Sequence, residues 1–558
     1  MNILKTHNIH VWFKTNLIVL LIIFLSGCDA LLQSKTDPNG IVYCSEGSPA
    51  SFNPQLDTSG TTVDASSHQI YDRLIDFDPV TGDIVPALAT SWLVSNDGIT
   101  YTFQLRKEVS FHQTKTFKPT RFFNADDVLF SIDRWRLVDH PYHDISGGRY
   151  PYTDSLNLGG LITQVKRLNG YRVEITLDKP ESSFLANLAT DFSVMLSAEY
   201  ADKLVSRNQK ELIDYKPVGT GPYQLANFRQ DHYIRYTKHP KHWRQIELTD
   251  KLIFDITPSS SLRLAKLLTG ECDAIALPAH SELEVIRQQE DLVLDEKPGL
   301  NIGFWAFNTS KPPFDNPQVR RALGMAIDRN VLLETIYFNS AIAAKNIIPP
   351  TSWAFQADVR SLSYNPIAAK KLLREQGVPE GFSMTVWAMP VQRAYNPNAM
   401  KMAELIQAYL QEVGIQVNII SYEWSTFRER LTDGLHDSVL IGWSADNGDP
   451  DNFYRPLLSC AAIESGTNRA MWCSQEYDLL INQALQYTDI SERTYFYGKA
   501  NELLAEQLPL IPIAHASRYQ AYRKNLDGFV NESWEDHWTE VMISGKVFGK
   551  DIKINKND

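Results

Sequence analysis

The alternation of helical and extended patterns in the second half of the chain limits the folds that it can adopt. Between Asn396 and Gly414, apolar residues recur at the spacing of one helix face: Met402, Leu405, Ile406, Tyr409, Leu410 and Val413. A strand pattern follows at 415–419, then a helix-like segment near 426–435, then an apolar run at 439–441 that is typical of a buried strand. This order is a β–α–β pattern, which predicts an α/β fold with a mostly parallel sheet.

Three expected helices in this half begin with an Asn-Pro pair, at Asn316-Pro317, Asn365-Pro366 and Asn396-Pro397. An Asn side chain caps free backbone N–H groups, and Pro suits the first helical position because its missing N–H is not needed there. The first half is dominated by strand-like stretches at 40–44, 101–105 and 172–177. With roughly 530 residues after the leader, the chain is too long for one core, so two or three domains are expected.

The first 27 residues have the pattern of a signal peptide. Lys5 and Lys14 precede an apolar run at 17–25, which is shorter than the roughly twenty residues that span a bilayer. The run ends in Leu25-Ser26-Gly27-Cys28, which resembles the lipobox of bacterial lipoproteins and implies lipidation of Cys28 and a tether over 28–38. Asp29 resembles the inner-membrane retention signal of Gram-negative lipoproteins. We therefore expect a periplasmic protein tethered to the inner membrane; an ordinary secretory signal is the alternative.

The charge of the chain argues against one class of partner. The formal net charge is −12, and it becomes −14 once the two leader lysines are removed. An acidic chain without a run of five or more Lys and Arg residues binds nucleic acids poorly, so no such partner is expected.

Four cysteines besides Cys28 suit an oxidising compartment. An even count in an exported chain favours two disulfides. Cys460 and Cys473 are close enough in sequence to close one loop, which leaves Cys44 and Cys272 to pair across a long one. A zinc site is the alternative, but neither a Cys-x-x-Cys spacing nor a His cluster supports it, so no metal is expected.

Asp446 is the main candidate for a ligand contact. The buried run at 439–441 leads into Trp443 and Asp446, and Pro450 is expected to end regular structure. A lone buried carboxylate costs several kcal/mol, so it needs a cation. Ligands of such sheets bind beyond the carboxyl ends of the strands, where a ligand ammonium would fill that role. A loop-capping or internally paired carboxylate is the alternative.

The chain contains none of the common catalytic or cofactor motifs. We find no His-Glu-x-x-His, no Gly-x-Ser-x-Gly, no phosphate-binding loop and no Gly-x-Gly-x-x-Gly. The segment 446–451 superficially resembles a calcium loop, but Leu457 stands where a bidentate Glu is required. We expect no enzyme activity and no cofactor.

Several blocks resemble the extracytoplasmic solute-binding proteins of family 5, peptide-binding type. The blocks are Trp92, Asp97-Gly98, Tyr101-Thr102-Phe103, Leu105-Arg106, Phe111-His112, Asn124-Ala125-Asp126-Asp127-Val128 and Gly219-Thr220-Gly221-Pro222-Tyr223. The likeness covers about Gly40 to Ile543.

The resemblance implies two α/β lobes of the periplasmic binding protein type II, cluster C, with an extra small domain on lobe I. The implied boundaries are lobe I at 39–298 with an inserted subdomain at about 81–218, lobe II at 299–516, a return to lobe I at 517–545, and a C-terminal tail at 546–558. The family's bridges imply the pairs Cys44–Cys272 and Cys460–Cys473.

The same resemblance implies a peptide site between the lobes. Asp446 matches the carboxylate that holds the ligand ammonium, and Arg393 matches the guanidinium that holds the ligand carboxylate. A loop of lobe I, Thr58-Ser59-Gly60, would touch the ligand from the other side. The implied neighbours are Ala394, Tyr395, Trp443, Ser444 and Ala445, the last in place of an expected glycine. The alternatives are a strut role for Arg393, packing roles for Tyr395 and Trp443, and a simple turn at Thr58-Ser59-Gly60.

The function that the resemblance implies is peptide import. The chain would be a monomeric substrate-binding component that takes di- and short oligopeptides and delivers them to an ABC permease with its ATPase subunits. Segments 45–66 and 387–404 resemble the dipeptide branch, whereas 455–462 and the region after Leu508 resemble a branch that captures cationic antimicrobial peptides. Capture of such peptides and haem binding by a lipoprotein remain the alternatives.

Overall fold

The computed structural model describes residues 40–526, apart from 79–80, 245–248 and 360, and the strands at 539–543 and 546–550. The expected signal peptide, the tether with Cys28, and most of the C-terminal tail lie outside the described residues.

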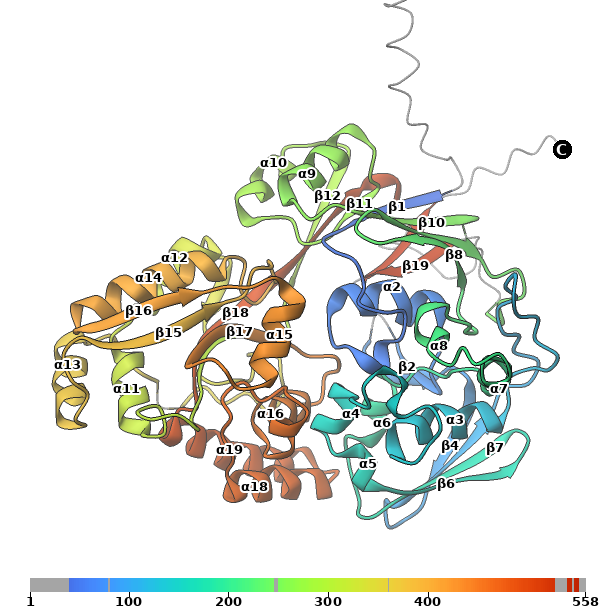
Figure 1. Ribbon diagram of the computed structural model, residues 1–558, viewed down its shortest axis with the longest axis horizontal. Helices are drawn as coiled ribbons and strands as arrows, with labels where there is room; N and C mark the ends of the chain where they lie inside the picture. Colours follow the sequence, from blue (N-terminus) through green and yellow to red (C-terminus); the bar gives the residue numbers. More distant parts are fainter. Residues whose placement is uncertain are drawn as a thin grey trace, which may run out of the picture.

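Two hydrophobic cores divide the described chain into two lobes (Figure 1). The core of lobe I is built from residues between Ile41 and Ala276, joined by Tyr522 and Leu526. The core of lobe II runs from Ile302 to Ala516. The two-lobed α/β fold is thus confirmed, while the exact lobe boundaries stay a prediction.

One large sheet runs through both lobes. In lobe II its order is β16 (Ile415–Ile420), β15 (Phe382–Ala388), β17 (Ser438–Ser444), β13 (Asn301–Phe307) and β18 (Leu510–Arg523). It continues into lobe I through β11 (Ala274–Ile275), β1 (Gly40–Ser45), β10 (Lys251–Ile256), β9 (Tyr233–Lys238) and β8 (Tyr223–Arg229). Strands β16, β15 and β17 are parallel, but β13 is antiparallel to both β17 and β18. The prediction of a mostly parallel sheet is therefore right for the β–α–β unit and wrong for the whole, which is mixed.

Smaller sheets and helices complete the lobes. Two further strands of the large sheet, β12 (Leu292–Pro298) and β14 (Ala341–Ala343), pair with β18. The smaller sheets are formed by β2 (Ile75–Phe77) with β3 (Ile84–Pro86), by β4 (Ala89–Val94), β5 (Thr100–Leu105), β7 (Arg172–Leu177) and β6 (Ile162–Asn169), and by β19 (Thr539–Ile543) with β20 (Lys546–Lys550). The helices before residue 300 are α2 (Gly60–Ile70), α3 (Ala125–Arg136), α4 (Pro151–Ser155), α5 (Leu158–Leu161), α6 (Phe184–Leu188), α7 (Ala198–Ser206), α8 (Leu212–Tyr215), α9 (Ser260–Thr269) and α10 (Leu283–Arg287). The later helices are α11 (Pro317–Met325), α12 (Arg329–Tyr337), α13 (Pro366–Glu375), α14 (Ala399–Glu412), α15 (Trp424–Thr432), α16 (Asp451–Leu458), α17 (Ala461–Glu464), α18 (Gln475–Gln486) and α19 (Ile490–Gln507).

Two of the three expected Asn-Pro caps are confirmed, and the third is displaced. Asn316 and Asn365 cap α11 and α13 with Pro at the first helical position. Helix α14 instead takes its cap from Asn398. Asn396 belongs to the preceding loop, because its backbone exchanges hydrogen bonds with that of Arg393 at 3.1 and 3.2 Å. The helix therefore begins two residues later than the sequence suggests.

The lobes are joined where β18 passes the β12–β13 connection. The amide of Asn301 donates to the carbonyl of Ala516 and accepts from its N–H, both at 2.9 Å. A Cβ on Gly299 would lie 2.0 Å from the Asn301 amide nitrogen and 2.4 Å from the Ala516 oxygen. Only glycine fits this crossing, which gives the two lobes a defined connection.

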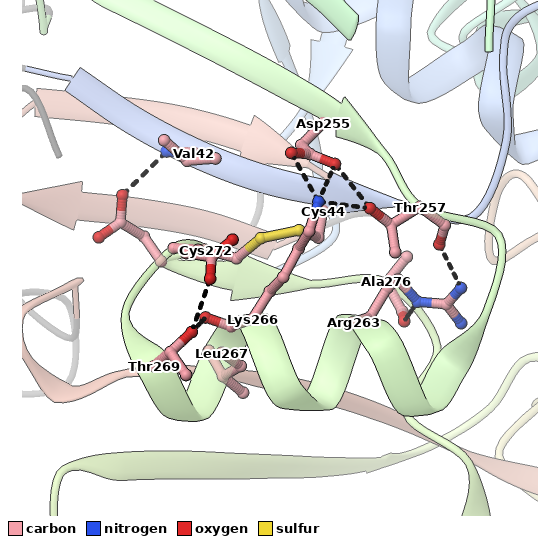
Figure 2. Close-up of a disulfide and its surroundings, with 12 residues drawn as sticks. Val42, Cys44, Asp255, Thr257, Arg263, Lys266, Leu267, Thr269, Cys272 and Ala276 are labelled. Atoms are coloured by element: carbon pink, nitrogen blue, oxygen red, sulfur yellow. Dashed lines mark hydrogen bonds and ion pairs between the residues drawn. A yellow bond between two sulfur atoms is a disulfide. The ribbon is translucent and has the colours of Figure 1, made fainter. Parts of the chain in front are cut away.

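Both expected disulfides are present in the structure. Cys44 on β1 is bonded to Cys272, which follows α9, and Cys460 is bonded to Cys473. Figure 2 shows the first bridge beside the ion pair of Lys266 and Asp255, whose closest atoms are 2.7 Å apart. The bridge thus ties the segment that follows α9 to β1 in lobe I.

Candidate functional site

Asp446 lies two residues beyond the carboxyl end of β17, as its sequence position predicts. Its backbone N–H donates to Oδ1 of Asn452 at 3.0 Å, and the indole N–H of Trp443 donates to the same oxygen at 3.2 Å. Pro450 does not end regular structure but precedes the first turn of α16. Strand β17 and α16 therefore hold Asp446 in a short, braced loop.

The carboxylate of Asp446 has an unmet need for a cation or donor. Its Oδ2 is buried and has no hydrogen-bonding partner among the described residues. Burial raises the pKa of this carboxyl well above its usual range, and the charge of Asp191 in lobe I raises it further. The side chain is nevertheless only half-buried. Desolvation of the carboxyl disfavours its charged form, so a nearby cation would be needed to keep it ionised.

The other two aspartates of the same motif are paired. Asp449 forms an ion pair with Arg493 at 2.7 Å. Asp451 accepts from Nε of Arg455 with both oxygens, at 2.7 and 2.8 Å. Among the described residues, Asp446 is thus distinguished from its neighbours by the lack of a cationic partner, which its residue type alone does not reveal.

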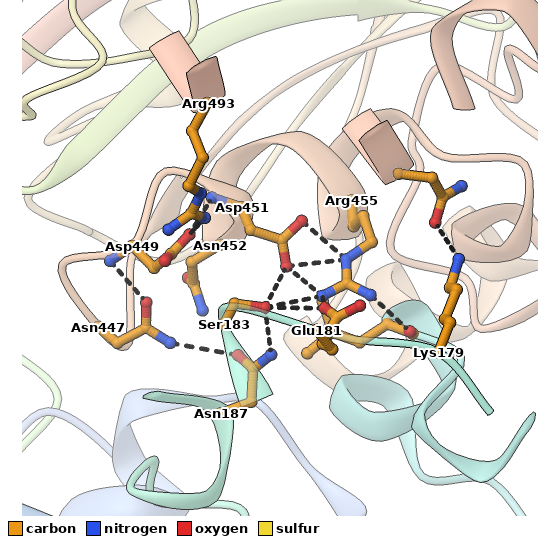
Figure 3. Close-up of polar contacts among 12 residues, drawn as sticks. Lys179, Glu181, Ser183, Asn187, Asn447, Asp449, Asp451, Asn452, Arg455 and Arg493 are labelled. Atoms are coloured by element: carbon orange, nitrogen blue, oxygen red, sulfur yellow. Dashed lines mark hydrogen bonds and ion pairs between the residues drawn. The ribbon is translucent and has the colours of Figure 1, made fainter. Parts of the chain in front are cut away.

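Figure 3 shows that the segment from Asn447 to Arg455 also faces lobe I. Arg455 forms an ion pair with Asp451 of its own helix and another with Glu181 of lobe I. It also donates to the carbonyl of Leu156 of lobe I at 3.1 Å. Close by, the amide of Asn452 donates to the hydroxyl of Tyr152 at 2.9 Å. These contacts bring the lobes together beside Asp446.

Arg393 lies on a loop that packs closely on the sheet, because two glycines of the sheet leave room for it. Gly303 on β13 and Gly442 on β17 are directly paired across the strands. A Cβ on Gly303 would lie 2.2 Å from the carbonyl oxygen of Tyr395, and one on Gly442 would lie 2.3 Å from its ring. The hydroxyl of Tyr337 also donates to the Tyr395 carbonyl at 2.8 Å. Tyr395 therefore anchors the loop that carries Arg393.

Two arginines of lobe II reach carboxylates of lobe I. Nη1 of Arg393 lies 3.3 Å from Oε1 of Glu46, and Arg428 on α15 forms an ion pair with Asp57. Burial alone would raise the pKa of Asp57, but the Arg428 guanidinium and the hydroxyls of Ser59 and Thr62 outweigh it and lower the pKa. Charges of opposite sign thus face each other between the lobes.

A third arginine, Arg469, lies beside this pair. Its Nη1 donates to the hydroxyl of Thr432 at 3.2 Å. Burial and the neighbouring Arg428 charge lower its pKa to about 9. The hydroxyl of Tyr395 is close enough to be influenced by the charges of Arg393, Arg428 and Arg469 together.

The remaining predicted site residues surround these groups. Ser59 precedes α2 and donates to Asp57, so the loop at Thr58-Ser59-Gly60 positions an ion pair between the lobes. The backbone N–H of Ala445 donates to the carbonyl of Leu300 at 2.8 Å, and Ser444 is exposed at the end of β17. Ala394 lies in the loop between Arg393 and Tyr395 and is half-buried.

Sequence reasoning missed six residues of this region: Glu46, Asp57, Tyr152, Asp191, Arg428 and Arg469. The spacing of Trp424 and Arg428, four residues apart, was a usable signal because such residues share one face of a helix. The others come from segments distant in sequence, so no local pattern marks them.

His112 and His515 are both buried. Nε2 of His112 lies 2.9 Å from the Gly221 carbonyl, and Nδ1 of His515 lies 2.7 Å from the Asn301 carbonyl. Neither residue offers an exposed nitrogen to a haem iron. Within the described part of the chain, no three His, Cys, Asp or Glu side chains gather as a metal site would require. In that same part, no helix has both the length and the apolar character needed to cross a membrane.

Comparison with known proteins identifies the family of this chain. The family model for bacterial extracellular solute-binding proteins, family 5 middle, matches residues 83–465. The dipeptide-binding protein of Escherichia coli is 45% identical over 92% of this chain and 95% of its own length. The peptide transport periplasmic protein SapA of Salmonella typhimurium is 43% identical, over 88% of this chain and 89% of its own.

A solved structure is also similar over most of the chain. The dipeptide-binding protein of Pseudoalteromonas sp. SM9913, in complex with Met-Leu, has a TM-score of 0.86 and 48% identity, covering 88% of this chain and 97% of its own. The family match spans more than half of the chain, and these relatives match nearly their whole lengths. The chain therefore belongs to the bacterial extracellular solute-binding proteins of family 5.

Proposed function

We propose that this protein is the substrate-binding component of a peptide ABC importer, which binds di- and short oligopeptides between its two lobes. The observation that carries this proposal is the unpartnered, buried Oδ2 of Asp446, which lies on the side of lobe II that faces Asp191 of lobe I. Relatives at 45–48% identity are dipeptide-binding proteins, and one is solved with Met-Leu.

The two charged ends of a free peptide suit the two ends of the interlobe region. Asp446 accepts from the α-ammonium, and Arg393 grips the α-carboxylate. Nη1 of Arg393 donates to Glu46 and to the carbonyl of Gln392, and a guanidinium carries N–H groups on two further nitrogens that can donate to a ligand. Fixing both ends sets a limit on length, because a peptide that satisfies only one end leaves a buried charge unpaired.

Closure of the lobes is coupled to binding through the same charges. Without a ligand, closure places the Asp446 carboxylate in the field of the Asp191 carboxylate. A bound ammonium removes that penalty, while Arg393–Glu46 and Arg428–Asp57 join the lobes. The ligand therefore stabilises the closed state through its difference in affinity for the two states.

The setting of the protein follows from its leader. We propose a periplasmic monomer, lipidated at Cys28 and held at the inner membrane, that hands its peptide to a permease driven by ATPase subunits. Mass spectrometry of the N-terminal fragment from membranes tests the anchor, because a diacylglyceryl group on Cys28 adds a defined mass.

Native mass spectrometry of the protein expressed from Asp29 tests the proposed function. We expect co-purifying peptides of two or three residues, which the Asp446→Asn variant no longer retains. Titration calorimetry should show at least about 100-fold weaker dipeptide binding, since breaking a buried ion pair costs about 3 kcal/mol or more. Glu404→Gln is the matched control, because it removes the same charge from an exposed position of lobe II and should leave binding unchanged.

Two results would contradict this specificity. A single bound mass of haem would favour a haem carrier, and long basic peptides alone would favour capture of cationic antimicrobial peptides. Peptide binding that survives in Asp446→Asn would remove Asp446 from the site.

A further inference from the structure

The arginines of the site follow one face of α15. Trp424, Arg428 and Thr432 are four residues apart, so their side chains point the same way at steps of about 6 Å along the helix. One guanidinium lies at each of these three positions. That of Arg393 lies 5.5 Å from the centre of the Trp424 ring, that of Arg428 belongs to the helix itself, and that of Arg469 donates a hydrogen bond to the hydroxyl of Thr432. Helix α15 faces α2 of lobe I in Figure 1, so this row of charges is turned toward the other lobe.

Within the described part of the chain, two carboxylates lie opposite this row of three guanidiniums. Glu46 pairs with Arg393, and Asp57 pairs with Arg428. Among the described residues, no Asp or Glu forms an ion pair with Arg469, and its one side-chain hydrogen bond goes to the neutral hydroxyl of Thr432. One positive charge of the row is therefore uncompensated.

The surroundings of Arg469 favour an anion over open water. The side chain is half-buried and lies beside the like charge of Arg428, and its lowered pKa shows that the surroundings disfavour its charged form. A carboxylate beside Arg469 would neutralise the excess charge, and a guanidinium can donate two parallel hydrogen bonds to it.

We propose that Arg469 forms a second carboxylate-binding position beyond Arg393, and that the protein therefore prefers short peptides with an acidic side chain. This inference rests on the proposed function, because it assigns a further contact to the same ligand. The amino end of the peptide is held at Asp446 and its terminal carboxylate at Arg393. Arg469 then meets a carboxylate that lies farther along α15, from an acidic side chain or from the end of a third residue.

A set of small peptides tests the proposal by titration calorimetry. We expect Ala-Glu to bind about tenfold more tightly than Ala-Gln, the value of one hydrogen bond to a charged group. In Arg469→Gln this preference should vanish while Ala-Ala binds as before, and Arg469→Lys should restore part of it. Arg430→Gln is the matched control, because Arg430 is an exposed arginine of the same helix that stacks on Tyr422.

The outcomes separate the source of the carboxylate. Loss of affinity in Arg469→Gln for Ala-Ala-Ala, but not for Ala-Glu, overturns the preference for an acidic side chain and assigns the position to the end of a third residue instead. Equal loss for Ala-Ala, Ala-Gln and Ala-Glu overturns the proposal, as does an unchanged Ala-Glu to Ala-Gln ratio. If no peptide binds the unaltered protein, the proposed function itself fails, which differs from peptide binding without an acidic preference.

Discussion

Two neighbouring regions of lobe II differ in whether a buried carboxylate has a cationic partner. At Asp451, both oxygens accept from Arg455, which also reaches Glu181 of lobe I. At Asp446, five residues earlier, one buried oxygen has no partner among the described residues. Among the described residues, the first region has its own cation, Arg455, although Oε2 of Glu181 is left without a hydrogen-bonding partner, and the second has none. A buried carboxylate with a cation inside the fold is explained by structure, whereas one without a cation is a candidate for ligand binding.

The largest expected effect comes from breaking the region that has its own cation. Arg455→Met would leave Asp451 and Glu181 as buried carboxylates without their guanidinium, which costs about 3–5 kcal/mol. For a lobe of this size, that loss corresponds to a fall in Tm of roughly 10 °C in differential scanning calorimetry.

The control for this variant is Lys401→Met, which breaks the exposed pair of Lys401 and Glu404 and should change stability by less than about 0.5 kcal/mol. A fall in Tm no larger than that of the control would show that Arg455 is dispensable. The contrast between the two acidic regions would then be lost.

A smaller effect is expected at Arg428, whose pair joins the lobes but is partly exposed. Arg428→Gln removes the ion pair with Asp57 that forms across the interlobe region. We expect about tenfold weaker binding of Ala-Ala, equivalent to about 1.4 kcal/mol, with little change in the Tm of the ligand-free protein. Calorimetry and small-angle X-ray scattering with saturating peptide would measure affinity and closure. A large fall in Tm with unchanged affinity would instead assign Arg428 to the fold of lobe II.

The sequence predicted those parts of the molecule that local patterns determine. The β–α–β unit, the caps at Asn316 and Asn365, and the place of Asp446 beyond a buried strand all follow from periodicity and helix-start chemistry. The antiparallel pairing of β13 with β18 could not be predicted from these patterns, because it depends on how the chain crosses between the lobes.

The candidate site divides in the same way. Asp446 was predicted from its place beyond a buried strand and Arg393 from the family resemblance, but their surroundings depend on partners far away in sequence, such as Glu46 and Asp191. Which of three aspartates in one motif lacks a partner is decided by the positions of Arg493 and Arg455, and no local pattern records that.

The smallest expected effect concerns the stability of the ligand-free protein, and it has a defined pH dependence. Burial raises the pKa of Asp446 in the folded protein well above its ordinary value of 3.8, so the folded state binds this proton more tightly than the unfolded state. The contribution of Asp446 to stability is therefore most favourable below about pH 4 and is lost as the pH rises through the folded-state pKa.

At pH 7, Asp446→Asn removes an unpaired charge and should raise the Tm of ligand-stripped protein by about 2–4 °C, for roughly 1 kcal/mol. Thermal unfolding of both proteins between pH 4 and pH 8 should show this gain shrinking toward the acidic end. A saturating dipeptide should reverse the order at pH 7, because only the unaltered protein gains a partner for its carboxylate. A variant that is less stable than the unaltered protein without ligand would mean that Asp446 already has a partner within the fold.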